Sequence, residues 1–228
     1  MDKDDFLSGK VLLIDKPLNW TSFQVVNKIR WHIKQKFDLK KIKVGHAGTL
    51  DPLATGLLII CCGKKTKNIN DYQALVKEYT GTITLGATTP SYDLETEIDE
   101  TYPIDHITET ILRNTAQDFI GSIQQKPPIF SAIKKDGKRL YELARKGETT
   151  EIKSRLVTIS EFELTKIDFP NISFRVVCSK GTYIRSLAYD FGKALNSGAH
   201  LSKLRRTKIG DFTVEKSKTV EEFISYLQ

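Results

Sequence analysis

A single acidic residue, Asp51, lies within a glycine-rich segment whose composition predicts a loop from Gly45 to Ala54. Glycines 45, 48 and 56 bracket this carboxylate, and glycine-rich backbone can approach a ligand closely. A free aspartate titrates at about 3.9, so Asp51 can serve as a base, a nucleophile or a fixed negative charge at neutral pH. Without further information, Asp51-Pro52 is more typical of a turn, and His46 of a structural histidine.

Basic residues gather in three clusters in a chain of net charge +7. The clusters run from Lys34 to Lys43, from Lys134 to Arg139 and from Lys203 to Lys208. Each alone is typical of a solvated surface. Three clusters with aromatic residues nearby favour a groove that follows the phosphates of a nucleic acid.

The three cysteines, Cys61, Cys62 and Cys178, lie in apolar segments without metal-ligand spacing, and the four histidines do not complete such a site. We therefore expect reduced core cysteines and no metal. The acidic N-terminus lacks the layout of a signal peptide, and no apolar run approaches the roughly 20 residues of a membrane span. The expected location is the cytoplasm.

Hydrophobic periodicity and capping residues predict the elements that hold these side chains. Thr21 and Gln24 have the form of a capping box that opens a helix reaching about Phe37. Leu57 to Cys62 is predicted as a buried strand that Gly63 ends. The other predicted elements of the first half are strands at 10–15 and 78–86 and a helix capped by Thr108 that stops at Gly121.

In the second half, Pro170-Asn171 separates two alternating segments, 156–168 and 172–178, which predicts a hairpin. Between 123 and 151 the chain looks like an excursion from the core, with a short helix over Leu140, Leu143 and Ala144. Two further helices are expected, over 183–195 and after the Thr219/Glu222 capping box. Strands and helices are mixed without a strict βαβ repeat, which favours an α+β fold with a largely antiparallel sheet flanked by helices.

Seven ordered blocks, spread over residues 10 to about 210, resemble the motifs of TruB-type tRNA pseudouridine synthases. The resemblance implies the pseudouridine synthase fold with a thumb-like RNA-binding insertion at about 123–152. The blocks are Lys16–Ser22, Gly45–Gly56, Lys77–Tyr79, Thr88–Asp93, Pro127–Tyr141, Cys178–Arg185 and Ala199–Thr207.

The resemblance implies three catalytic residues: Asp51 as the essential carboxylate, Tyr79 and Arg185. The Tyr79 ring would stack on the target uracil, and its hydroxyl would assist proton transfer. Arg185 would keep Asp51 ionised and would also link to Asp93.

Five further residues are implied in substrate binding. His46 would fill the space that a flipped base vacates, and Tyr183 and Leu204 would line the pocket. Lys16 would be a buried lysine that supports the active-site loop, although an exposed turn lysine fits the sequence equally well. Asp93 completes the set through its link to Arg185.

The implied reaction converts uridine to pseudouridine at position 55 in the T-loop of tRNA. It breaks the N1–C1′ bond and rejoins the base through C5, so it requires no cofactor. Whether Asp51 adds to the base, attacks C1′ or assists a glycal-forming elimination is left open. The expected partner is the T-arm of tRNA, bound by a monomer with no membrane and no obligatory protein partner.

The family often carries a C-terminal RNA-binding domain of PUA type, and too few residues follow Gly210 to form one. We therefore expect one catalytic domain over 1–228. Two other functions fit parts of the sequence. An RNA-folding chaperone could use the same scaffold without catalysis, and a basic scaffold protein would account for the charge but not for the Asp51 loop.

Overall fold

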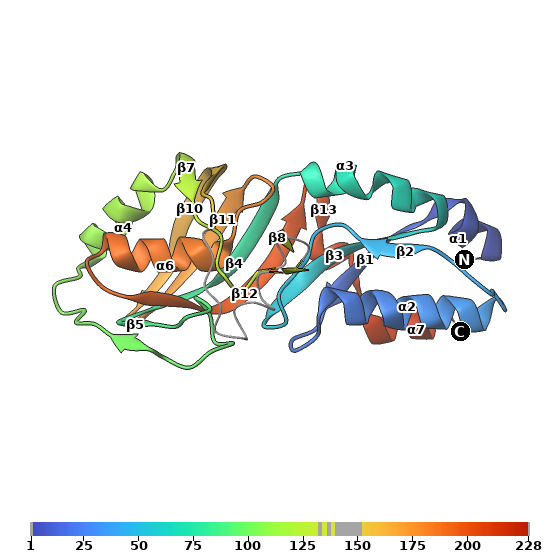
Figure 1. Cartoon of the computed structure of the whole chain (residues 1–228), viewed down its shortest axis with the longest axis horizontal. Helices are drawn as coiled ribbons and strands as arrows, with labels where there is room; N and C mark the ends of the chain where they lie inside the picture. The colour runs from blue at the N-terminus through green and yellow to red at the C-terminus, as the bar shows by residue number, and fades with distance from the viewer. Residues whose placement is uncertain (1, 132–133, 136–137, 140–151, 228) are drawn as a thin grey trace. The chain divides into compact units, whose positions relative to one another are not determined.

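The computed structural model describes residues 2–131, 134–135, 138–139 and 152–227, in two units. The first unit comprises Met1–Thr80 and Leu204–Gln228, and the second comprises Gly81–Lys203. Strands β4 (Lys77–Leu85) and β12 (Ala199–Ile209) each contribute residues to both units (Figure 1).

In the first unit the strand order is β14-β1-β3-β12-β4, with β2 beside β3 and β13 beside β12. β1 pairs antiparallel with β3, whereas β14 pairs parallel with β1 and β12 parallel with β3. The strands that belong to this unit alone are β1 (Val11–Lys16), β2 (Val44–His46), β3 (Ala54–Cys62), β13 (Phe212–Thr213) and β14 (Lys218–Thr219).

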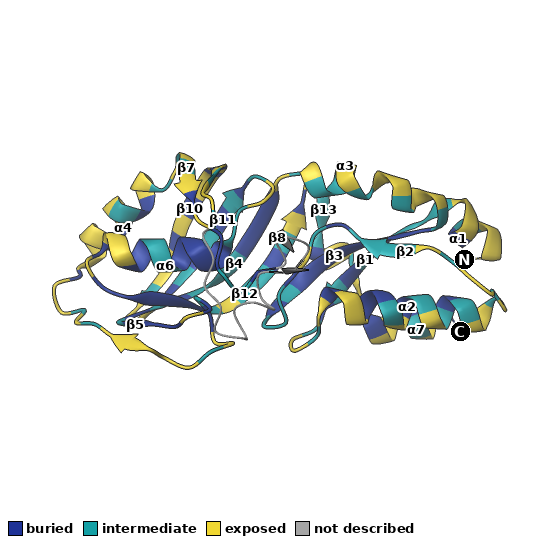
Figure 2. Cartoon of the chain, viewed as in Figure 1, coloured by how far each residue is buried: buried dark blue, intermediate teal, exposed yellow. Residues whose placement is uncertain are grey.

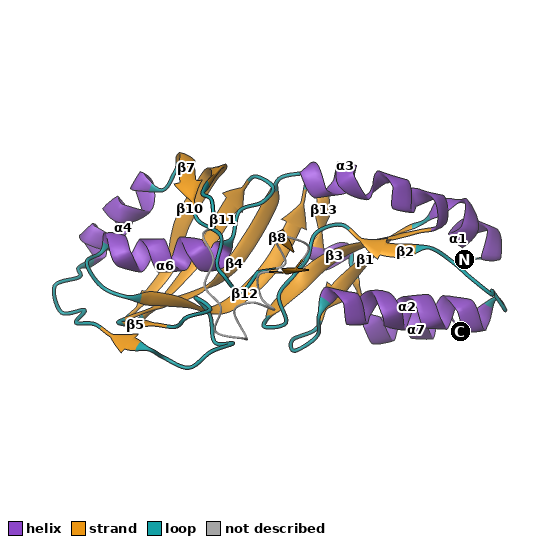
Figure 3. Cartoon of the chain, viewed as in Figure 1, coloured by secondary structure: helices purple, strands orange, loops and turns teal. Residues whose placement is uncertain are grey.

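Helices cover both faces of these strands (Figure 3). Helices α2 and α7 pack against one another on one face (Figure 1). The helices of this unit are α1 (Lys3–Gly9), α2 (Ser22–Lys36), η1 (Gly63–Asn68), α3 (Ile69–Ala74), η2 (Val214–Lys216) and α7 (Val220–Leu227).

Strand β3 separates two hydrophobic cores, which explains its continuous apolar sequence (Figure 2). Leu58, Ile60 and Cys62 face the core under α2 and α7, whereas Leu57, Ile59 and Cys61 face the core under α3. Successive side chains of a strand alternate between its faces, so a strand buried on both faces has no polar position. The three cysteines are free and buried, as predicted.

In the second unit the strand order is β12-β4-β11-β10-β7. β10 pairs antiparallel with both β7 and β11. Helices α4 and α6 contact one another. Edge-to-face contacts join the rings of Phe119, Phe162, Phe174 and Phe191. The elements of this unit alone are β5 (Ala87–Thr88), β6 (Glu100–Thr101), α4 (Glu109–Asp118), β7 (Gly121–Gln125), β8 (Lys134–Lys135), β9 (Lys138–Arg139), β10 (Arg155–Asp168), β11 (Asn171–Cys178) and α6 (Ile184–Ala194).

The predicted α+β fold with a mostly antiparallel sheet is confirmed, and so are the capping boxes. Thr21 and Gln24 bond reciprocally at the start of α2, and Thr219 and Glu222 do so at the start of α7. Helix α1 was not predicted, although Asp2 and Asp5 form a third capping box that could have marked it.

Two predicted boundaries differ from the structure. Strand β3 begins at Ala54, within the segment predicted as loop, because it pairs there with β12. Ile123, placed at the start of the excursion, is held in the sheet by pairing with Val157. The helix predicted over 140–144 lies outside the described residues.

Candidate active site

The loop that carries Asp51 connects β2 to β3 in the first unit, and its backbone is bonded before and after the carboxylate. Ala47 N–H donates to Ile59 O at 2.9 Å, and Ala54 N–H donates to Asp51 O at 3.1 Å. Leu50, the residue before Asp51, is buried, whereas Asp51 itself is half-buried. The carboxylate therefore stands on a short, tethered segment rather than on a loose loop.

The first turn of α2 holds the loop on one side. Ser22 Oγ accepts from Leu50 N–H at 2.8 Å and lies 3.1 Å from Leu50 O, to which its hydroxyl donates. Asn19 N–H donates to Pro52 O at 2.8 Å. Asn19 adopts φ +63°, a conformation that asparagine tolerates better than most residues. Leu50 and Pro52, the two neighbours of Asp51, are thus both bonded to residues 19–22.

Lys16 also bonds to the Asp51 loop. It is 0 % exposed, and its Nζ donates to Trp20 O at 2.6 Å, Pro17 O at 2.8 Å and Pro52 O at 3.4 Å. Burial lowers the pKa of Lys16 to about 8, and the Asp51 carboxylate opposes this shift. Lys16 therefore remains mostly an ammonium at neutral pH. The structure confirms that Lys16 is buried and bonded to the Asp51 loop.

Arg206 supports the loop from β12, a position that the sequence did not reveal. It is 1 % exposed, and its guanidinium donates to Leu57 O through Nε at 2.8 Å and to Gly48 O through Nη2 at 3.1 Å. Gly56 permits this approach, because a Cβ there would lie 2.3 Å from Arg206 O.

This placement corrects the interpretation of Arg206 as part of a basic surface. Arg206 is internal, and Arg205 makes two hydrogen bonds to Asp15, at 2.6 and 3.1 Å. Lys208 Nζ lies 3.6 Å from Glu78 Oε2. A strand over these residues would have placed Leu204 and Arg206 on one face, which is the signal that could have identified a buried arginine.

Three other predicted site residues also lie in the first unit. Tyr79 is nearly buried on β4, and Leu204 on β12 pairs with Ala54 at the end of the Asp51 loop. His46 is on β2, where burial and the charge of Arg206 lower its pKa, so its imidazole is neutral at neutral pH. Among the described residues, no hydrogen-bond partner meets the buried Nδ1 of His46.

Arg185 and Asp93, in the second unit, form a buried ion pair. Arg185 Nε lies 3.6 Å from Asp93 Oδ2, with side chains 3 % and 6 % exposed. Arg185 also donates to Ser91 O at 3.1 Å and to Phe130 O at 2.7 Å. The expected link between Arg185 and Asp93 is therefore present, and backbone carbonyls hold the guanidinium in a fixed orientation.

Tyr183, the third predicted residue of this unit, caps α6 and is held by two side chains that the sequence did not indicate. Gln125 is buried and bonds both the Tyr183 N–H, at 2.8 Å, and the Tyr183 carbonyl, at 3.0 Å. The Arg155 guanidinium carbon lies 4.5 Å from the centre of the Tyr183 ring. Gln125 and Arg155 are themselves opposite one another in the β7–β10 ladder.

The eight predicted site residues thus belong to two units. Asp51, Tyr79, His46, Lys16 and Leu204 are in the first, and Arg185, Asp93 and Tyr183 are in the second. The catalytic roles, including the action of Arg185 on Asp51, stay predictions. The described residues contain no cluster of three or more His, Cys, Asp or Glu suited to a metal ion. No helix in the described part of the chain is both long and apolar enough to cross a membrane.

Comparison with known proteins places this arrangement in a family. Residues 34–184 match the model of the TruB family pseudouridylate synthase N-terminal domain, and residues 185–228 match that of the tRNA pseudouridylate synthase B C-terminal domain. The chain is 64 % identical to tRNA pseudouridine synthase B of Flavobacterium johnsoniae, with all of both chains covered. It is 60 % identical to the protein of that name from Phocaeicola vulgatus, covering 98 % of this chain and 95 % of the relative.

Solved structures agree with the sequence relatives. The fold resembles a chain of a Cbf5-Nop10-Gar1 complex with a TM-score of 0.72 and 31 % identity, over 97 % of this chain and 55 % of that one. A chain of the archaeal box H/ACA sRNP Nop10-Cbf5 complex has a TM-score of 0.69 and 28 % identity, over 97 % of this chain and 54 % of that one. This chain therefore spans about half the length of those structural relatives. The length of the family-model match and the sequence identity to the relatives together establish that the chain belongs to the TruB family of pseudouridylate synthases.

Proposed function

We propose that this enzyme isomerises uridine to pseudouridine at position 55 in the T-loop of tRNA, with Asp51 as the essential carboxylate. The observation that carries the proposal is the tethering of the Asp51 loop. Ser22, Asn19 and Lys16 bond the backbone on both sides of the carboxylate, and Arg206 bonds it at Gly48. A reaction that depends on one carboxylate benefits from such fixed geometry.

The chemistry requires no redox partner. The N1–C1′ bond breaks and a C5–C1′ bond forms, while C5 loses a proton and N1 gains one, so substrate and product are isomers. Asp51 supplies negative charge and a proton acceptor at the sugar or the base. We assign Tyr79 to stacking on the uracil and Arg185 to keeping Asp51 ionised.

The target base must leave its stack before it can react, which costs a few kcal/mol. One aromatic stacking contact returns roughly 1–3 kcal/mol, so Tyr79 offsets part of the cost. We assign His46 to the space that the base vacates, where its neutral imidazole avoids a buried charge. Lys16 and Arg206 hold the loop, whereas Tyr183 and Leu204 line the pocket in this proposal.

We further propose that the purified chain acts without a protein partner, in the cytoplasm and as a monomer. The two structural relatives were solved in complexes with Nop10, or with Nop10 and Gar1. An activity assay on the isolated chain therefore tests whether a protein partner is required.

The decisive experiment incubates purified protein with an unmodified T-arm hairpin and measures pseudouridine. Wild type should form pseudouridine at position 55, and Asp51→Asn should abolish turnover. Asp38→Asn is the matched control, because Asp38 is exposed in the same unit and has φ +48°, which asparagine tolerates. Equal activity of Asp51→Asn and wild type would refute the role of Asp51, and an inactive wild type would refute the substrate.

A further inference from the structure

Helix α2 carries two large aromatic side chains on its solvent side. Phe23 is 62 % exposed and Trp31 is 55 % exposed, although Val25, Ile29 and Ile33 of the same helix are buried. The helix therefore has a complete apolar face without these two residues. Packing of the α2 core face therefore does not involve the exposed Phe23 and Trp31 rings.

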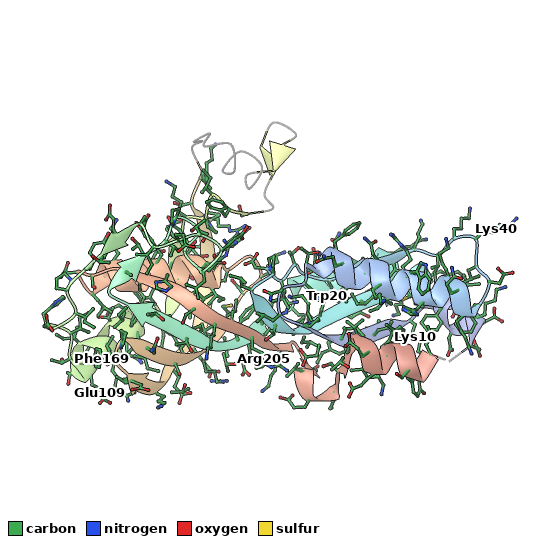
Figure 4. All side chains as sticks on the ribbon, turned by 90° about the horizontal axis from the view of Figure 1, so that it is seen from below. Lys10, Trp20, Lys40, Glu109, Phe169 and Arg205 are labelled. Carbon is green, nitrogen blue, oxygen red and sulfur yellow. The ribbon has the colours of Figure 1, made fainter. Side chains whose placement is uncertain are left out.

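The helix that carries the two rings is basic. Helix α2 contains Lys28, Arg30, Lys34 and Lys36 and no Asp or Glu. The helix packed beside it, α7, begins instead with Glu221 and Glu222. Side chains project from α2 along its length between the labelled Trp20, before its first turn, and Lys40, beyond its last turn (Figure 4).

Helical geometry places these groups together. At 3.6 residues per turn, Phe23, Asn27, Arg30, Trp31 and Lys34 fall within one arc, which we call the α2 outer face. Phe23 and Trp31 are eight positions apart, or about 12 Å along the axis, a distance that a few nucleotides span. Two rings and two cations thus share one strip of surface.

The α2 outer face begins beside the Asp51 loop. Ser22, the residue before Phe23, bonds both backbone groups of Leu50, and Leu50 precedes Asp51. Leu18, in the turn whose Asn19 bonds Pro52, is also 53 % exposed. The first turn of α2 therefore lies next to the Asp51 loop, within reach of an RNA strand that places a nucleotide at Asp51.

We infer that the α2 outer face binds the RNA substrate, with Phe23 and Trp31 stacking on bases or riboses and Lys34 and Arg30 facing phosphates. The inference rests on the proposed RNA substrate. RNA fits better than a protein, because the cores of protein interfaces are depleted of lysine, whereas proteins that bind single strands combine aromatic platforms with cations. The acidic start of α7 sets one boundary of the surface.

The test measures affinity for an unmodified T-arm hairpin and for a full tRNA transcript over a range of salt concentrations. Phe23→Ala and Trp31→Ala should each weaken binding roughly 5-fold to 100-fold, while Trp31→Phe should keep most of the affinity. Lys34→Gln should lower the slope of log K against log salt by about 0.7, and Trp31→Ala should leave that slope unchanged. If these residues only stabilised the fold, the aromatic and the lysine variants would not differ in the salt dependence of RNA binding.

Tyr226→Ala is the matched control, because Tyr226 is 61 % exposed on α7, the helix that begins with Glu221 and Glu222. Its affinity should equal that of wild type. Unchanged affinity in both Phe23→Ala and Trp31→Ala would overturn the inference. An equal loss in Tyr226→Ala would also overturn it.

The outcome can be separated from that of the proposed function. If wild type forms pseudouridine but the α2 variants bind RNA normally, only the surface assignment fails. If the α2 variants lose affinity but wild type forms no pseudouridine, the surface stands and the proposed reaction fails.

Discussion

The Ser22 hydroxyl forms hydrogen bonds with both backbone groups of Leu50. Ser22 Oγ accepts from Leu50 N–H at 2.8 Å and donates to Leu50 O at 3.1 Å. One hydroxyl thereby connects the first turn of α2 to the residue before Asp51. Both residues are buried, so water does not replace the bonds. The position of the carboxylate depends on a side chain distant from it in the sequence.

Ser22→Ala should therefore reduce both stability and activity. The variant leaves the buried N–H and carbonyl of Leu50 without this partner, which costs about 1–3 kcal/mol of unfolding free energy. A small displacement of the loop should lower kcat by roughly 10-fold to 100-fold. Denaturant unfolding and single-turnover rates measure the two effects.

Ser160→Ala is the control for Ser22→Ala. Ser160 Oγ donates to Val177 O at 3.1 Å, but the residue is exposed. Its removal should change unfolding free energy by less than about 0.5 kcal/mol. Full activity in Ser22→Ala would contradict the role of this bond in positioning Asp51.

Lys16 should make stability depend on pH in the alkaline range. Its pKa is about 8 in the folded chain, below its ordinary value of 10.5, because burial disfavours the charge. Between these values the unfolded chain holds a proton that the folded chain has released, so unfolding free energy rises with pH. Below about pH 8 both states are protonated and this dependence vanishes.

The measurement compares wild type with Lys16→Met from pH 7 to 10.5. Wild type should gain up to about 3 kcal/mol of unfolding free energy relative to the variant across the upper part of that range. A difference between the two proteins that stays constant with pH would disprove the depressed pKa.

Gly56 and Gly121 should respond differently to alanine. Both have positive φ, +103° and +110°, so both substitutions strain the backbone by about 1–2 kcal/mol. A Cβ at Gly56 would also lie 2.3 Å from Arg206 O, whereas a Cβ at Gly121 meets no atom within 4 Å. Gly56→Ala should lose more than about 3 kcal/mol, and equal unfolding midpoints for the two variants would refute the close approach of β3 and β12.

Cys61 and Cys62 should resist thiol reagents in the native protein. Burial raises the pKa of Cys61 to about 11 and that of Cys62 to about 12, so almost no thiolate exists at pH 8. Labelling with a thiol-reactive dye should proceed only as fast as the chain unfolds. The denatured protein, in which all three cysteines react, is the control, and rapid labelling of either residue at pH 8 would contradict their burial.

Elements with local signals were predicted well. The residues that begin α2 and α7 bond within one helical turn, so Thr21 with Gln24 and Thr219 with Glu222 mark those starts in the sequence. The apolar run before Gly63 identified β3 because burial on both faces excludes polar residues. The α1 capping box shows that the same signal was present at Asp2 and was missed.

The buried side chains that hold the Asp51 loop were harder to predict. Lys16 could equally have been an exposed turn residue, and Arg206 was taken as part of a basic surface. Both are buried because they meet carbonyls from distant parts of the chain, Pro52 for Lys16 and Gly48 and Leu57 for Arg206. The spacing of residues within a short stretch of sequence does not indicate which distant carbonyl will accept a hydrogen bond.

The sequence by itself determined the α+β class, the two buried faces of β3, the main helix starts and the family, since each depends on residue types at short or ordered spacing. Only the tertiary structure decided that Lys16 and Arg206 are internal, that Gln125 clamps Tyr183, and that the aromatic residues of α2 remain exposed. Desolvation and hydrogen bonding of a side chain depend on every element that packs around it. Those neighbours are brought together by the fold, not by their distance along the chain.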